Sequence, residues 1–303
     1  MVFDVALSTM WAVGRFPELT GFFDAGRRLG FARFELNHAI NSAMLEGLSL
    51  DSMIRSIHEP CPADPPMGVL KERNWLVSAP GEENRRLGVA AVRRSIDLAH
   101  KLGVGVVIVH PGRVDIDTHP ESELMSLYHA GKADRPEYAL IKERLVAARA
   151  AQAETNMRSV RRSLVELAEY AARMGVRLGL ENRYHYPEIP LPDELEDLLS
   201  LGCGEVVGYW HDVGHAQVLE HLGFGTHEEW LRRFGGPRGR ILGVHLHDVA
   251  GITDHQAAGK GQMDWEMVAR YLPVGALRTC EFLASNSPEE VAAGARLLAE
   301  KGV

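Results

Sequence analysis

The chain has 303 residues, which is large for one average domain, and its hydrophobic (46%) and charged (24%) fractions are those of a soluble globular protein. Its three scattered cysteines form no CxxC pair, which argues against a disulfide framework or a zinc–cysteine site and favours a reducing, cytoplasmic location. The net charge of −8 disfavours nucleic acid as a partner, and we expect neither a signal peptide nor a membrane span, because no apolar run approaches about 20 residues.

Short apolar runs recur along the whole chain and predict strands. Several of them are rich in β-branched residues, which is typical of strands buried on both faces of a parallel sheet. The expected strands are Asp4–Leu7, Ala32–Leu36, Met53–His58, Val104–His110, Val176–Glu181, Val206–His211, Ile241–Leu246 and Leu277–Phe282.

The segments between these runs have helical patterns, and most end at a glycine, the usual residue just past a helix. The expected helices are Pro17–Leu29, Glu82–Leu102, a long one ending at Met174, Pro192–Leu201, His227–Phe234, Trp265–Tyr271 and Pro288–Lys301, whereas Ser42–Leu50 barely makes a helix. An irregular charged stretch, Arg113–Pro136, precedes the long helix. We therefore expect an insertion of about residues 113–158 after the fourth strand: a lid, a contact in a homo-oligomer, or a plain surface elaboration.

Eight strands alternating with helices predict an α/β fold, a single (β/α)₈ TIM barrel that spans residues 1–303 and carries this extended insertion. No GxGxxG turn follows the first strand, which argues against a Rossmann-type dinucleotide-binding fold. In such a barrel the C-terminal ends of the strands meet at one face, where active sites lie. Polar residues at strand ends are therefore the candidates for function.

Four residues with metal-binding side chains occupy successive strand ends. Glu181 precedes Asp212 by 31 residues, Asp212 precedes His245 by 33, and His245 precedes Glu281 by 36. Three carboxylates and one imidazole suit a divalent metal such as Mn²⁺, Mg²⁺, Co²⁺ or Zn²⁺. Crowded carboxylates would raise one another's pKa unless a cation offset their charge. Any single glutamate is more often a salt-bridge or capping residue, but four on consecutive units predict a metal site.

Histidines extend the pattern at the same face. Candidates for binding a second metal or the substrate are His58, His110, His215 and His255. By strand alternation, His211 and His247, which neighbour the proposed ligands, are expected to point the other way. Arg183, His185 and Lys260 also lie near strand ends and are candidates for binding anionic groups of a substrate, although such residues are more often surface charges.

With these motifs the sequence resembles the xylose isomerase-like TIM barrels, a superfamily that includes sugar phosphate isomerases and epimerases, hydroxypyruvate isomerase and endonuclease IV (AP endonuclease family 2). The resemblance rests on LGLENR around Glu181, WHDVGHA around Asp212, GVHLHDVAG around His245 and GKGQMDW from Gly259. The resemblance to the sugar isomerases and epimerases implies that Glu181, Asp212, His245 and Glu281 hold one metal. It also implies that the two glutamates serve as acid and base. The residue matching His215 contacts substrate there.

The resemblance to endonuclease IV implies a different centre, with three zinc ions. The matching positions are His58, His110, Glu181, Asp212, His215, His245, His255 and Glu281. Thr253 stands where that enzyme has an aspartate, and Asp254 follows one position later. The acidic net charge also weighs against a DNA substrate.

Our leading hypothesis is a divalent-metal-dependent isomerase or epimerase of a small sugar, sugar phosphate or related keto compound. A carboxylate would move a proton next to a carbonyl that the metal polarises. Two alternatives stay open: a zinc phosphodiesterase similar to endonuclease IV that acts on DNA, and a metal-dependent sugar or cyclitol dehydratase.

Overall fold

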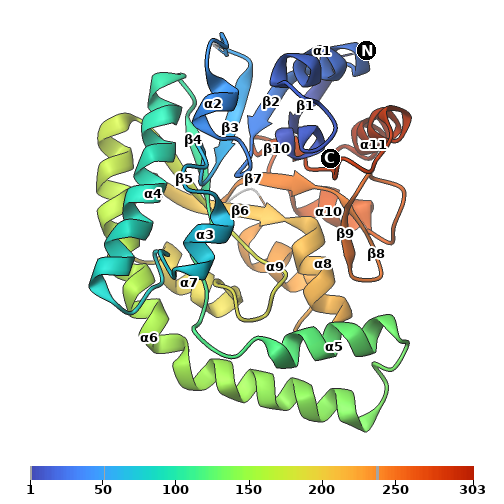
Figure 1. Ribbon diagram of the computed structural model, residues 1–303. Coiled ribbons are helices and arrows are strands. Elements are labelled where there is room, and N and C mark those ends of the chain that lie inside the picture. The colour runs from blue at the N-terminus through green and yellow to red at the C-terminus, as the bar shows by residue number, and fades with distance from the viewer. Residues whose placement is uncertain (1, 51, 237–238) are drawn as a thin grey trace.

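The strands of the protein close into one barrel, seen here in a computed structural model that describes residues 2–50, 52–236 and 239–303. Within those ranges, eight parallel strands follow one another around the barrel in the order β1-β10-β7-β6-β5-β4-β3-β2 (Figure 1). The predicted TIM barrel is confirmed. The strands are β1 (Phe3–Ser8), β2 (Phe31–Leu36), β3 (Ile54–His58), β4 (Val106–Val109), β5 (Arg177–Glu181), β6 (Val207–Asp212), β7 (Ile241–Leu246) and β10 (Leu277–Cys280).

Helices surround the barrel, and most of them match the expected segments. They are α1 (Leu19–Leu29), α2 (Ser42–Leu45), α3 (Met67–Glu72), α4 (Glu82–Lys101), α5 (His119–His129), α6 (Pro136–Met174), α7 (Pro192–Leu199), α8 (Val213–His221), α9 (His227–Phe234), α10 (Trp265–Tyr271) and α11 (Pro288–Lys301). A 3₁₀ turn covers Thr9–Ala12. Among the described residues, no helix combines the length and the hydropathy that a membrane crossing requires.

Three helices and one hairpin were not expected from the sequence. Helix α5 lies inside the stretch Arg113–Pro136, which we had described as irregular, and α3 is a short turn of helix. Helix α8 is buried along most of its length, from Val213 to Leu219, so its sequence lacks the alternation of apolar and polar residues that marks a surface helix. The antiparallel hairpin of β8 (Asp248–Ala250) and β9 (Thr253–Gln256) lies between the seventh expected strand and the expected helix Trp265–Tyr271, where no element was predicted.

The interior of the barrel ends in a floor beneath its C-terminal face. Trp210 of β6 is fully buried and packs with Val106 and Ile108 of β4. A Cβ atom on Gly243 of the neighbouring strand would collide with the Trp210 ring, so glycine is required there. The ring of Trp210 lies 5.2 Å, between centroids, from the ring of His245. The polar strand ends therefore rest on an apolar layer.

The insertion after β4 is fastened to the barrel. Helix α5 and the N-terminal half of α6 form an arm along one side of the molecule (Figure 1). Glu121 of α5 accepts a hydrogen bond from the backbone N–H of Tyr186 at 2.5 Å, and Tyr138 of α6 donates to the carbonyl of Leu222 at 3.0 Å. These contacts make the insertion a brace on the loops after β5 and α8, a role that was not among those expected.

Arg149 of α6 is a buried charged residue of this brace. Its guanidinium makes a two-pronged contact with Glu194, at 2.8 and 2.7 Å, and donates to the carbonyls of Tyr186 and Glu188 at 2.8 and 3.1 Å. Arg149→Met leaves the buried acceptors unpaired, and we expect it to lower the free energy of unfolding by about 3 kcal/mol, as for other broken buried ion pairs. Urea unfolding checks this, with exposed Arg144→Met as the control; equal midpoints for the two variants would contradict it.

Candidate metal centre

The four predicted ligands come from four strands that are neighbours in the barrel. Glu181 ends β5, Asp212 ends β6, His245 lies near the end of β7, and Glu281 directly follows β10. Asp212 and His245 stand opposite each other in the β6–β7 register. Because parallel strands end at the same face, residues from distant parts of the chain become neighbours.

The side chains converge on the imidazole of His245. Its Nδ1 atom lies 2.7 Å from Oε1 of Glu181, 3.1 Å from Oε2 of Glu281 and 3.5 Å from Oδ2 of Asp212. All four side chains are at most 2% exposed. The structure thus brings the whole predicted set together around one point, out of contact with bulk water.

The charges of this group fit a divalent cation. Burial lowers the pKa of His245, but the carboxylates of Glu281 and Glu35 outweigh it and raise that pKa well above its ordinary value. Burial raises the pKa of Glu281, whereas His245 and His255 bring it well below its usual range. Oε1 of Glu281 has no hydrogen-bond partner among the described residues. A buried carboxylate oxygen without a partner, beside two further carboxylates and an imidazole, is a donor set for a metal.

Glu35 is a buried carboxylate that the sequence analysis missed. It lies in β2, and its Oε1 atom is 3.1 Å from Nε2 of His245, on the side of the ring that faces away from the other carboxylates. Ser56 of β3 donates to its Oε2 atom at 2.7 Å. A histidine that binds a metal through one nitrogen usually donates its other N–H to such a carboxylate, which sets its tautomer. An acidic residue inside the apolar run FARFEL was the available signal.

We expect Glu35→Leu to weaken metal binding by about 10- to 100-fold, because the His245 ring loses the acceptor that orients it. Glu35→Gln, whose amide oxygen still accepts, should lie between Glu35→Leu and the wild type. Isothermal titration with Zn²⁺ measures this, with exposed Glu46→Gln as the control. Equal dissociation constants for all four proteins would exclude a role for Glu35 at the metal.

Two predicted histidines flank the group on the side of Glu181. His58 ends β3 and His110 directly follows β4. Their Nε2 atoms lie 3.4 and 2.7 Å from Oε2 of Glu181. Together with Glu181 they have the spacing of a further metal site. His38, missed by the sequence analysis, stands behind them with its ring centroid 5.3 Å from that of His58, and burial lowers its pKa to about 3.

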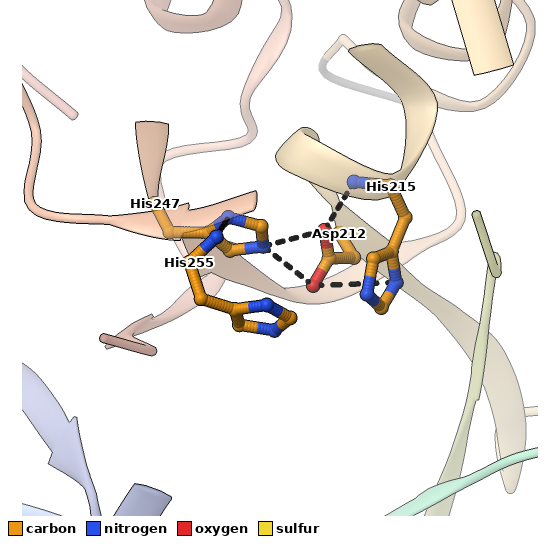
Figure 2. Close-up of side chains that lie close together, drawn as sticks. All are labelled: Asp212, His215, His247 and His255. Atoms are coloured by element: carbon orange, nitrogen blue, oxygen red, sulfur yellow. Dashed lines mark hydrogen bonds and ion pairs between the residues drawn. The ribbon is translucent and has the colours of Figure 1, made fainter. Parts of the chain in front are cut away.

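The other predicted histidines surround Asp212 (Figure 2). His215 lies in the first turn of α8, which begins after Asp212, and His255 lies in β9. Nδ1 of His215 is 3.5 Å from Oδ2 of Asp212, and Nε2 of His255 is 3.6 Å from Oε2 of Glu281. Asp254 approaches the same place, 3.9 Å from Nε2 of His215.

The expectation that His247 points away from the site is wrong. Its Nε2 atom lies 2.9 Å from Oδ1 of Asp212 (Figure 2), and the four residues Asp212, His215, His247 and His255 have the spacing of a metal site. His247 stands two positions after His245, so the period of two in a strand predicts the same face for both side chains, and the expectation did not follow from alternation. Gly214 leaves the room for its ring, since a Cβ there would collide with it. His211 does point away, with Nδ1 2.6 Å from the Tyr209 hydroxyl.

Of the three candidate substrate-binding residues, one faces the proposed metal centre and two do not. Arg183 faces the centre, with its Nη1 atom 2.6 Å from Oε2 of Glu181. His185 lies on the rim, half-exposed, 3.0 Å from Oε2 of Glu121 on α5. Lys260 is instead paired with Glu290 of α11, at 2.7 Å. Of the three, Arg183 makes direct contact with a proposed ligand.

Comparison with solved structures shows the same fold elsewhere. A D-tagatose 3-epimerase-like protein superposes over 98% of this chain and 96% of its own, with a TM-score of 0.65 and 18% identity. The IOLI protein with a bound zinc atom covers 98% of this chain and 97% of its own, with a TM-score of 0.66 and 13% identity. At these identities the likeness is one of fold.

Sequence comparison places the chain in a family. It is 26% identical over 198 residues to an uncharacterized protein of Methanocaldococcus jannaschii, MJ1311, a match that covers 64% of this chain and 55% of that relative. The family described as xylose isomerase-like TIM barrel matches residues 23–301. That range holds every strand of the barrel except β1, together with all four proposed ligands. The chain therefore belongs to the xylose isomerase-like TIM-barrel family.

Proposed function

We propose that the protein is a divalent-metal-dependent isomerase or epimerase of a small sugar, sugar phosphate or related keto compound. The observation that carries this is the set of three buried carboxylates within 3.5 Å of one imidazole nitrogen, at the C-terminal face of the barrel. An epimerase-like protein and a zinc-containing protein among the structural neighbours support it.

The residues divide the work of proton transfer between them. Glu181, Asp212, His245 and Glu281 would hold the cation, which when bound polarises a carbonyl and an adjacent hydroxyl of the substrate. Glu281, whose Oε1 atom has no hydrogen-bond partner among the described residues, would accept the proton beside that carbonyl. Glu181 would return a proton from the other side, and Glu35 keeps His245 oriented throughout. The Trp210 floor excludes water from below.

Deuterium exchange tests this proposal. The protein, loaded with Mn²⁺, Co²⁺ or Zn²⁺, is incubated in D₂O with ketoses, aldoses, inososes and their phosphates. We expect deuterium at the carbon next to the carbonyl of the accepted substrate, seen by NMR as loss of one proton signal, together with an isomeric product. Exchange followed by loss of water would identify a dehydratase instead. Absence of exchange from every compound would count against proton-transfer chemistry.

A second function, zinc-dependent hydrolysis of phosphodiesters, is favoured by one observation. Besides the four-ligand group, the groups of His58, His110 and Glu181 and of Asp212, His215, His247 and His255 have metal-binding spacing. Two or three neighbouring cations suit in-line displacement at phosphorus. Cleavage of DNA containing an abasic site, with three zinc ions per chain by elemental analysis, would support this function over the isomerase.

A further inference from the structure

Three side chains from different segments approach a single oxygen of the centre, Oε2 of Glu181. Nη1 of Arg183 lies 2.6 Å from it, Nε2 of His110 lies 2.7 Å from it, and Nε2 of His58 lies 3.4 Å from it. The opposite oxygen, Oε1, faces His245. The two histidines and Glu181 would make a second metal position, but a guanidinium already contacts the oxygen that this position needs.

Arg183 is held in this place by its other contacts. Its Nε atom lies 3.1 Å from Oε2 of Glu188, whose Oε1 atom is bound by Lys71 at 2.7 Å. The side chain of Arg183 is 11% exposed. The loop that carries both residues is tied to α6, because Arg149 donates to the carbonyls of Tyr186 and Glu188. A rotation of Arg183 out of the site would leave the carboxylates of Glu181 and Glu188 buried and without this partner.

We propose that Arg183 serves as the permanent second cation of the centre, and that its guanidinium keeps a divalent metal from the position formed by His58, His110 and Glu181. A guanidinium is always charged and its fixed fork of donors matches carboxylates, so it can satisfy Glu181 and Glu188 together. A metal ion at the same oxygen would meet strong like-charge repulsion in a site of low dielectric constant. His58 and His110 then remain free to bind substrate.

This inference rests on the proposed metal-dependent function and deepens it, because a centre with no metal at the His110 side suits proton transfer better than a multinuclear hydrolysis. It also gives Arg183 a role that differs from the binding of a substrate anion. The two functions considered above therefore differ in a countable quantity, the number of metal ions that depend on His110.

The test counts Co²⁺ ions per chain, by elemental analysis after dialysis against excess CoCl₂ and desalting. The proteins are the wild type, Arg183→Met, His110→Ala, the double variant and, as a matched loss of one nearby arginine, Arg113→Met. We expect Arg183→Met to hold one more ion than the wild type, and the double variant to return to the wild-type count. His110→Ala and Arg113→Met should equal the wild type.

Two results would overturn the inference. One is a Co²⁺ count that is lower by one in His110→Ala than in the wild type, since a metal would then occupy the position despite Arg183. This comparison tests the inference even if Arg183→Met fails to fold. The other is an unchanged count in folded Arg183→Met. A wild type that holds cobalt while Arg183→Met gains none removes only the role of Arg183. Absence of cobalt from every protein would overturn the proposed function as well.

Discussion

Replacement of Glu281 by glutamine is expected to lower turnover by about 10³-fold or more while the barrel stays folded. The substitution keeps the size of the side chain but removes both a proposed metal ligand and the carboxylate proposed to accept the proton. The fold should tolerate it because glutamine fills the same space, and the stability lost is that of the attraction of His245 and His255, which holds the pKa of Glu281 low. Once a substrate is found by deuterium exchange, kcat measures the loss of turnover and circular dichroism shows whether the barrel stays folded.

Glu300→Gln is the matched control, because Glu300 lies exposed near the end of α11, and its kcat should equal that of the wild type. Undiminished turnover in Glu281→Gln would remove Glu281 from the chemistry. A large loss of turnover accompanied by unfolding would instead assign it a structural role.

Addition of a divalent metal is expected to raise the melting temperature by roughly 6 °C. A ligand present at a thousand times its dissociation constant adds about 4 kcal/mol to the free energy of unfolding, and for a chain of 303 residues that energy corresponds to several degrees. The gain arises because the cation offsets three buried carboxylates whose charge is otherwise balanced mainly by His245 and neighbouring cationic side chains. Differential scanning calorimetry of the chelator-treated protein, with and without Zn²⁺, Mn²⁺ or Co²⁺, measures the shift.

Glu281→Gln supplies the control for this experiment too. In that variant the shift should fall to a small fraction of the wild-type value, because one ligand and one negative charge are gone. An equal shift in the variant would place the stabilising metal elsewhere, at a surface site. No shift in the wild type with any of the three cations would contradict a metal centre.

Much of the fold could be predicted because its signals are local. The barrel strands are short and largely apolar, β4 is buried at every position, and the observed β7 coincides with the expected Ile241–Leu246. Helix α8 escaped notice because a helix buried on nearly all sides carries no polar stripe, and α5 because its short charged segment has little periodicity. Local pattern fails where a segment is uniformly buried or mostly exposed.

The candidate ligands were accessible to the sequence for a related reason. Glu181, Asp212, His245 and Glu281 each interrupt or end an apolar run, and the barrel topology sends all such positions to one face. His247 stands two positions after His245, so the alternation of a strand predicts that both side chains face the centre, and of the two neighbouring histidines only His211 is expected to point away. One residue beyond β7 the backbone turns into the β8–β9 hairpin and carries the ring toward Asp212.

By itself, then, the sequence determined the barrel, its strand ends and the four residues that could share a metal. Each buried strand is visible as a short apolar run, and the polar residue that ends the run is visible in the same stretch of sequence. The tertiary structure decided which partner each of them meets. Glu35 reaches His245 across the barrel, 210 positions away in the chain, and Arg183 meets both Glu181 and Glu188 through a loop that α6 holds in place. Those contacts depend on how strands and loops pack, and charge interactions in a buried site follow distance in space rather than position in the chain.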